Sequence, residues 1–173
     1  QLGFGYSHLM NDNKFWALSR LHIQILKSPQ WSTTLTVETW PRGFHGLLAF
    51  RDFLILDEKG ESCVLATSAW LILDIGTRRP QRVEKYLSGV ELVQRRAVDN
   101  SLEKLPGSDQ YGQELSRGVV YSDIDLNSHV NNTRYCGWVL DTYPPDQFET
   151  RRISEFTVNY LNELTIKDSV RVC

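Results

Sequence analysis

Apolar and polar residues alternate along several stretches in the first half of the chain. Such alternation is typical of β-strands, because successive side chains of a strand point to opposite faces of its sheet. The pattern predicts strands near residues 15–25 and 35–40, and apolar runs bounded by turn residues predict two more, near 48–56 and 63–75. Short turns separate these stretches, so an antiparallel sheet is the expected topology.

Two details of the predicted strands concern burial. The stretch 63–75 has too many apolar residues for a strand with one wet face, so we expect part of it to be buried on both sides. His22 falls on the polar side of the first strand. A polar position in an alternating strand usually faces water, so His22 is interpreted as a solvated residue and not as a ligand.

In the second half, a helical pattern follows a dense run of polar side chains. Residues at i, i+3, i+4 and i+7 predict a helix over 131–142, namely Tyr135, Trp138, Val139 and Thr142. Directly before it, polar side chains occupy alternate positions: Asp123, Asp125, Asn127 and His129.

These polar residues precede a helix start, where unpaired backbone amides and the positive end of the helix dipole lie. A single Asp or Asn in such a place usually serves as a cap and does nothing more. An acid, an amide and an imidazole together exceed what one cap requires. The stretch is therefore a candidate site for polarising a carbonyl group.

Between the strands and this helix, the character of the chain changes. Prolines, glycines and dense charge over residues 77–117 indicate an interdomain linker with at most a short helix at 86–93. The linker region begins with a basic group formed by Arg78, Arg79, Arg82 and Lys85. Two interpretations remain open for these cations: a solvated linker of mixed charge, or a docking surface for an acidic partner.

The composition narrows the functional classes. The 173 residues are 41% hydrophobic and 23% charged, which is typical of a globular protein with a sizeable core. A net charge of −2 predicts no general affinity for nucleic acid or anionic membranes. The four histidines and three cysteines (Cys63, Cys136 and Cys173) show no metal-ligand spacing, so no metal is expected.

A faint internal repeat runs through the chain at an offset of about 135 residues. It pairs Ser19, Leu21, Ile23 and Ile25 with Ser154, Phe156, Val158 and Tyr160. The same offset pairs Glu163 with Ser28, and it maps the predicted helix 131–142 to the first residues of the chain. We therefore expect two repeats, the first of which starts within or after its helix, and the second of which ends before its later strands.

The motif D-x-N-x-H-V-N-N-x-x-Y from Asp125 to Tyr135, with G-W close behind, resembles the second-domain motif of plant and bacterial acyl-acyl-carrier-protein (acyl-ACP) thioesterases. Several motifs within residues 16–80 are similar to the first domain of the same family: W-A-L-S-R-L-H-I, P-x-W, L-T-V-E-T-W, F-R-D-F, A-T-S-A-W and T-R-R-P. The resemblance covers most of the chain outside residues 82–115.

This resemblance implies an α+β fold of tandem hotdog domains, each an antiparallel sheet curled around a central helix, apparently truncated at both ends. The implied organisation is an acyl-binding, non-catalytic domain at 1–80, a linker at 81–115 and a catalytic domain at 116–173. Trp138 and Val139 are expected to face inward from the second helix.

The resemblance also implies the activity, the hydrolysis of fatty acyl-ACP to free fatty acid and holo-ACP in fatty acid biosynthesis, without a cofactor. The implied catalytic residues are Asp125, Asn127, His129 and Glu163. Glu163 would act as general base or nucleophile, His129 would position water or the carbonyl, and amides near Val130 to Asn132, with the Asn127 amide, would stabilise the oxyanion. Many plant members carry a cysteine after the acid, whereas Leu164 follows it here, which favours a carboxylate mechanism.

Two other functions stay open at this stage: an acyl-CoA thioesterase of the hotdog type, and a non-catalytic acyl-binding protein. The expected partner is the acidic acyl carrier protein, with Arg78, Arg79, Arg82 and Lys85 as its docking residues. The expected compartment is the cytoplasm, or the plastid stroma in a plant, and a homodimer stays open as an assembly.

Overall fold

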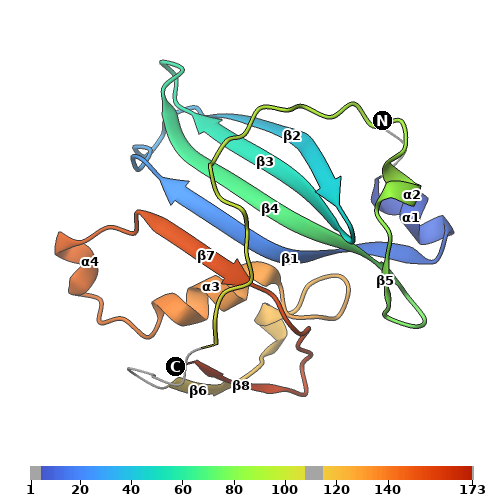
Figure 1. Cartoon of the computed structure of the whole chain (residues 1–173). Helices are drawn as coiled ribbons and strands as arrows, with labels where there is room; N and C mark the ends of the chain where they lie inside the picture. The colour runs from blue at the N-terminus through green and yellow to red at the C-terminus, as the bar shows by residue number, and fades with distance from the viewer. Residues whose placement is uncertain (1–4, 108–114, 173) are drawn as a thin grey trace. The chain divides into compact units, whose positions relative to one another are not determined.

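The alternating stretches of the first half form long strands in a computed structural model of the chain. These are β1 (Lys14–Ile25), β2 (Thr36–His45), β3 (Leu48–Leu56) and β4 (Ser62–Asp74). They lie in one sheet of order β2-β3-β4-β1-β7, in which β7 (Glu155–Asn159) comes from the second half and the short β5 (Pro80–Gln81) pairs with β4 (Figure 1). All pairings are antiparallel, so the predicted topology is confirmed.

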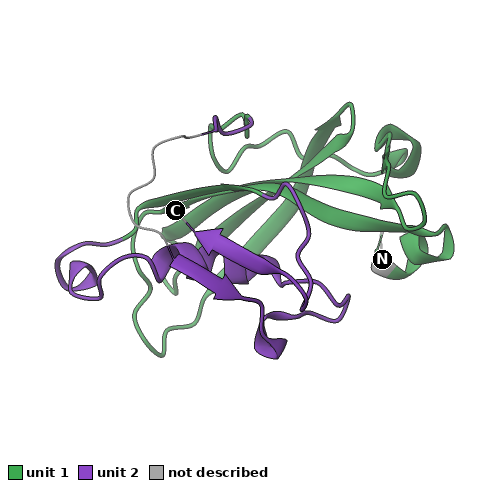
Figure 2. Ribbon diagram, turned by 90° about the horizontal axis from the view of Figure 1, so that it is seen from below, with its two compact units in different colours: residues 1–103, 153–159 green, residues 104–152, 160–173 purple. Residues whose placement is uncertain are grey.

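The structure describes residues 5–107 and 115–172. Residues 108–114 of the predicted linker, the first four residues and Cys173 lie outside this part. The chain divides into two compact units, coloured in Figure 2. Unit 1 comprises Gln1–Glu103 and Ile153–Asn159, and unit 2 comprises Lys104–Arg152 and Tyr160–Cys173.

The central strand β4 is buried on both faces, as the sequence predicts. Its four residues 66–69 are all buried, although alternate side chains point to opposite faces. On one face, Ile72 packs with Leu9 of α1 (Tyr6–Asn11) and with Val83 and Leu87, which flank or belong to α2 (Glu84–Leu87). β4 lies between β3 and β1 in the sheet, and other segments cover both of its faces, so its side chains are buried on both sides.

The second face carries a buried polar row and corrects the interpretation of His22. His22 is 1% exposed, and its Nδ1 lies 2.7 Å from the Thr157 hydroxyl. Cross-strand register places the buried Asp52, Thr67 and His22 beside the half-buried Thr157, on β3, β4, β1 and β7 respectively. Alternation correctly assigns His22 to the polar face, but that face is covered in the fold, so the expectation of a solvated side chain is wrong.

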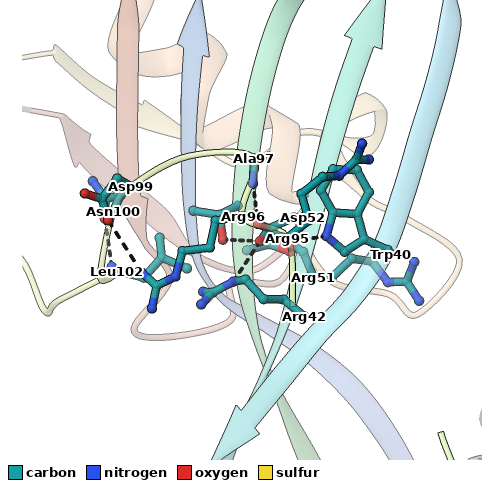
Figure 3. Close-up of polar contacts among 12 residues, drawn as sticks. Trp40, Arg42, Arg51, Asp52, Arg95, Arg96, Ala97, Asp99, Asn100 and Leu102 are labelled. Carbon is teal, nitrogen blue, oxygen red and sulfur yellow. Dashed lines mark hydrogen bonds and ion pairs between the residues drawn. The ribbon is translucent and has the colours of Figure 1, made fainter. Parts of the chain in front are cut away.

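Residues 94–102, which we call the strap, contact this face of the sheet at Asp52 (Figure 3). The Ala97 amide donates to Asp52 Oδ2 at 2.8 Å, and the Trp40 indole donates to the Arg95 carbonyl at 2.8 Å. Val98 and Leu102 are buried. The strap is therefore held on the sheet of unit 1 by Ala97, Val98 and Leu102, while the charged side chains of Arg95, Arg96 and Asp99 are exposed.

Unit 2 is built around α3 (Asn132–Leu140). Its other elements are β6 (Leu115–Gly118), η1 (Tyr121–Asp123), α4 (Gln147–Thr150) and β8 (Ser169–Val172), and β6 pairs with β8 antiparallel. Trp138 is buried with Val119, Val130 and Val172, as predicted for this helix.

Two expectations for α3 are wrong. Val139 is 39% exposed and does not face inward, because the buried stripe follows Tyr135 and Trp138 and the next residue turns away from it. The helix ends at Leu140, short of the predicted Thr142. The following Pro144 and Pro145 cannot continue a helix, and the Thr142 hydroxyl instead caps the Val139 carbonyl at 2.7 Å.

The strands related by the internal repeat are neighbours in the sheet. β1 and β7 pair antiparallel with His22 opposite Thr157, and these two residues are themselves 135 positions apart. Residues on either side pair symmetrically about this point, from Arg20 with Asn159 to Gln24 with Glu155. The register therefore has a local two-fold symmetry centred on the His22–Thr157 hydrogen bond.

Candidate active site

A short closed loop links η1 to α3 and carries three of the predicted site residues. Asp125 Oδ1 accepts hydrogen bonds from the backbone amides of Asn127 at 2.8 Å and His129 at 3.3 Å. The Asp125 amide donates to the His129 carbonyl at 2.8 Å. Short acidic side chains commonly bond the backbone two residues on in this way, so Asp125 shapes the loop through its backbone.

The structure brings His129 and Glu163 together. His129 Nε2 lies 3.6 Å from Glu163 Oε2, with the two side chains 26% and 38% exposed. This is an ion-pair distance and is longer than a hydrogen bond. The approach is fixed next to the pair, where the Val130 amide donates to the Leu164 carbonyl at 2.8 Å. An imidazole and a carboxylate therefore meet at a site that water can reach.

Asn127 lies at the exposed tip of the same loop. None of the contacts described for residues 115–172 joins its side-chain amide to His129 or Glu163. Ser128, beside it, adopts a left-handed backbone conformation with φ of +63°. The side-chain amide of Asn127 therefore remains available to a ligand. The loop turns sharply after this residue.

The predicted oxyanion donors are only partly free. The Val130 amide donates to the Leu164 carbonyl, and the Asn131 amide donates to the Asp123 carbonyl at 2.8 Å. The Asn131 side chain caps α3 by accepting from the Thr133 amide at 3.0 Å. Among the three predicted backbone amides, only that of Asn132 has no acceptor in the described part of the chain.

Sequence reasoning missed the residues that support the loop. Asp123 is 3% exposed, and its Oδ2 accepts from the Val120 amide at 3.0 Å and from Arg117 Nη2 at 3.2 Å. Its Oδ1 lies 3.5 Å from Arg134 Nε. Asp123 belongs to the alternating polar series, but no pattern in the sequence distinguishes a buried acid from an exposed one.

An aromatic group packs around α3. Tyr135 contacts Trp138 and Tyr160 with ring centroids 5.4 and 5.6 Å apart, and the Tyr160 hydroxyl donates to the Asn132 carbonyl at 3.2 Å. Cys136 Sγ lies 3.9 Å from the Tyr160 hydroxyl. Burial, followed by the neighbouring Cys136, raises the pKa of Tyr160 well above its usual value. Burial also raises the pKa of Tyr135, so both phenols stay neutral at ordinary pH.

The predicted docking cations lie in unit 1, around the turn from β4 to β5 and on α2. Arg78, Arg79, Arg82 and Lys85 are all exposed. Asp74 shapes the turn, since its carboxylate accepts from Lys14 Nζ and the Thr77 amide, both at 2.8 Å. The Lys14 hydrogen bond is the main cause that lowers the pKa of Asp74 far below its usual value. The Arg78 guanidinium lies 5.0 Å from the Phe15 ring centroid.

In residues 5–107 and 115–172, no group of three or more His, Cys, Asp or Glu side chains is arranged to hold a metal ion. Within the same residues, no helix is long and apolar enough to cross a membrane.

Comparison with known proteins places the chain. Residues 1–89 match the model of the acyl-ACP thioesterase N-terminal domain, and residues 108–173 match that of the C-terminal domain. The chain is 34% identical over 167 residues to the chloroplastic oleoyl-ACP thioesterase 2 of Arabidopsis thaliana, covering 90% of this chain and 46% of the relative. It is 32% identical to the chloroplastic dodecanoyl-ACP hydrolase of Umbellularia californica, covering 98% of this chain and 47% of the relative. The chain thus spans about half the length of these curated relatives.

Two solved structures of acyl-ACP thioesterases are similar to this chain in fold as well as in sequence. An acyl-ACP thioesterase from Bacteroides thetaiotaomicron superposes with a TM-score of 0.83 at 30% identity, covering 97% of this chain and 68% of that one. The 12:0-ACP thioesterase of Umbellularia californica gives a TM-score of 0.84 at 29% identity, covering 95% of this chain and 63% of that one. The α+β hotdog fold expected from the sequence is thereby confirmed. With family models matching both halves, the chain belongs to the acyl-ACP thioesterase family.

Proposed function

We propose that the protein hydrolyses fatty acyl-ACP, releasing a free fatty acid and holo-ACP in fatty acid biosynthesis. The observation that carries this proposal is the 3.6 Å approach of His129 Nε2 to Glu163 Oε2 beside the start of α3. An imidazole and a carboxylate at a water-accessible site are suited to activate water against a thioester. The family to which the chain belongs supports the choice of substrate.

The two acids of the site have different surroundings, which supports different roles. Asp125 Oδ1 already accepts two backbone amides, so Asp125 orients the loop that carries Asn127 and His129. Glu163 is 38% exposed and faces the imidazole. Glu163 therefore serves as the general base, a role worth about 10²–10⁴-fold in rate, or attacks the carbonyl directly as a nucleophile. His129 holds the attacking water or the substrate carbonyl in place.

The thioester carbonyl becomes negatively charged during attack and needs hydrogen-bond donors. The Asn132 amide at the positive end of α3 and the side-chain amide of Asn127 are the donors this site offers. One such donor contributes about 3 kcal/mol of transition-state stabilisation in comparable sites. The two donors come from the loop and the helix start, which the Asn131 cap holds together.

Among the described residues, no cysteine is placed to act as the nucleophile at this site, neither at position 164 nor at Cys136. The residue after Glu163 is Leu164, which packs against the buried cluster of unit 2. Cys136 contacts the Tyr160 hydroxyl, a phenol kept neutral by burial. A cysteine nucleophile needs a base or a cation that lowers its pKa, and a neutral phenol supplies neither. The surroundings of these residues favour attack driven by a carboxylate.

The first repeat has a supporting part in this proposal. It carries Ser28 where the second carries Glu163, so it binds the acyl substrate and does not react. The exposed cations Arg78, Arg79, Arg82 and Lys85 dock the acidic carrier protein. The proposed compartment is the cytoplasm, or the plastid stroma if the source is a plant, consistent with the chloroplastic names of the plant relatives. A homodimer is compatible with this function but is not needed by it.

The test is a panel of acyl-ACP and acyl-CoA thioesters of increasing chain length, assayed with the complete protein. Release of free thiol from acyl-ACP at a higher kcat/KM than from acyl-CoA supports the proposal. A preference for acyl-CoA in the side-by-side assay would assign an acyl-CoA thioesterase. Binding of acyl chains without turnover of either substrate would assign a non-catalytic acyl-binding protein.

A further inference from the structure

The loop of residues 124–131 has a fixed shape, and the hydrogen bond from the Val130 amide to the Leu164 carbonyl ties it to the segment of Glu163 at one point. A single tie fixes one point of the loop and leaves its direction to other contacts. Its own hydrogen bonds, from Asp125 to the amides of Asn127 and His129, close it on itself. Such internal contacts would survive a rotation of the whole loop. A tilt would nonetheless move His129 away from Glu163, and a displacement of 1 Å in an active site can cost about 10²-fold in rate.

Asp123 contacts residues that precede this loop and residues at its end and in the following helix α3. Before the loop, its carboxylate accepts from the Val120 amide at 3.0 Å and from Arg117 of β6 at 3.2 Å. After the loop, its carbonyl accepts from the Asn131 amide at 2.8 Å, and its Oδ1 lies 3.5 Å from Arg134 Nε of α3. One residue thus joins β6, η1 and the first turn of α3.

The two arginines are in turn attached to the frame of unit 2. The Arg117 guanidinium lies 4.9 Å from the ring centroid of the buried Trp138. Arg134 Nη2 donates to the Ser122 carbonyl. A carboxylate that is 3% exposed is costly to bury and is tolerated only when cations and amide donors surround it, as here. Capping η1 would need only the Val120 amide, so the two arginines point to a further role.

We propose that Asp123 is a positioning residue whose buried carboxylate, held between Arg117 and Arg134, directs the 124–131 loop so that His129 meets Glu163. This inference rests on the proposed function for its kinetic consequences. None of the contacts described for Asp123 involves His129 or Glu163 themselves. Asp123 therefore acts through the loop and is distinct from the residues proposed to touch the substrate.

The test compares Asp123→Asn with Asp141→Asn in the complete protein. Asparagine keeps the shape of Asp123 but removes the charge between the two guanidinium groups. Asp141 is the matched control, because its Oδ2 also faces Arg117, at 4.0 Å, but it lies at the far end of α3 and is 61% exposed. Asp123→Asn should lower kcat by about 10- to 100-fold with little change in KM, since the loss is in geometry. Asp141→Asn should change neither.

A second readout follows the pair without using activity. The ring nitrogen NMR signals of His129, assigned with His129→Gln, should move in Glu163→Gln and in Asp123→Asn but not in Asp141→Asn. If the wild-type protein hydrolyses no thioester, the proposed function fails, and the ring signals alone decide the positioning role. An Asp123→Asn protein with lower Tm but wild-type kcat and ring signals would overturn the inference, because Asp123 would then only stabilise the fold.

Should Asp123→Asn fail to fold, the half-exposed partner Arg134 carries the test. Arg134→Lys keeps the positive charge opposite Asp123, whereas Arg134→Gln removes it. Retained kcat in the lysine variant and a tenfold or larger loss in the glutamine variant, on the scale of about 10²-fold for a 1 Å displacement, would support the inference. Equal kcat and equal His129 ring signals in the two variants would overturn it.

Discussion

The two repeats present the same strand followed by different chemistry. β1 and β7 are equivalent strands, and each is followed by an exposed leucine at the matching position, Leu26 at 57% and Leu161 at 71% exposure. Two residues further on, the first repeat has Ser28 and the second has Glu163. The intervening Lys27 is held by Asp57 at 2.6 Å and by Glu61, whereas Glu163 faces His129.

This difference separates the shared frame of the two repeats from the site proposed for the second. The strand, its register and the exposed leucine recur in both repeats, so they belong to the architecture. The acid and its imidazole occur at the end of the second strand, whereas the first ends in a lysine ion pair. Under the proposed function, a few side chains on a repeated scaffold supply the chemistry. The following predictions test this separation.

The largest effect is expected at the position that differs most. Glu163→Gln should lower kcat for acyl-ACP at least about tenfold, because the general base or nucleophile is lost. Ser28→Ala, at the equivalent place in the first repeat, should leave kcat unchanged. Steady-state kinetics at saturating substrate measure both. Full activity in Glu163→Gln would show that the second strand end is no more catalytic than the first.

The loop residues should come next. His129→Ala and Asn127→Ala should each lower kcat at least about tenfold, since they remove the group that places the water and one oxyanion donor. Cys136→Ser and Cys63→Ser are the controls and should keep most of the activity. Inactivation by Cys136→Ser in a normally folded protein would contradict the carboxylate mechanism.

A smaller effect is expected from the cations of the first repeat. Changing Arg79 and Arg82 together to Glu should raise KM for acyl-ACP and weaken its dependence on salt, because exposed charges act mainly on the encounter rate and are screened beyond about 8 Å at physiological ionic strength. Hydrolysis of a small acyl-pantetheine thioester, which lacks the acidic protein, should hardly change. An equal loss on both substrates would assign these arginines to the fold or the site.

The smallest effect concerns acid stability, where each unit has a turn aspartate. Hydrogen bonds from Lys27 lower the pKa of Asp57 below its usual 3.8, and hydrogen bonds from Thr165 lower that of Asp168. A carboxyl whose folded pKa is lowered stabilises the protein above its unfolded pKa, and this contribution disappears as the pH falls through the folded value.

Tm measured as a function of pH should therefore fall below about pH 4, and less steeply in Asp57→Asn and in Asp168→Asn. The Asp57 contribution should shrink in high salt, because its main partner is a charged lysine, whereas that of Asp168 depends on neutral donors. An equal salt response of the two variants would contradict this distinction.

The strands were the part of the fold most open to prediction. β3 occupies the predicted residues 48–56 because turn-forming residues mark both of its ends, Gly46 before it and residues 57–60 after it. Alternation also places His22 on the correct face, but it contains no information on what covers that face. The strap on that face is joined to Trp40 and Asp52 through the Arg95 carbonyl and the Ala97 amide, backbone groups that leave no mark in the sequence pattern.

The candidate site was predictable in its residues more than in its contacts. The family resemblance proposes His129 and Glu163, and the structure places them 3.6 Å apart, while their catalytic role stays a prediction. The Val130 amide donates to the Leu164 carbonyl and the Asn131 amide to the Asp123 carbonyl. These hydrogen bonds depend on tertiary folding, so the local sequence pattern does not predict them. Burial of Asp123 was missed for the same reason.

The hydrogen bond between His22 and Thr157 has a consequence for the history of the chain. In a dimer of two identical single repeats, this position would lie on the two-fold axis and face its own copy. A residue type would then have to be its own hydrogen-bond partner. Joining the repeats in one polypeptide removes that restriction, so a ring nitrogen and a hydroxyl can meet where symmetry would have required two identical side chains.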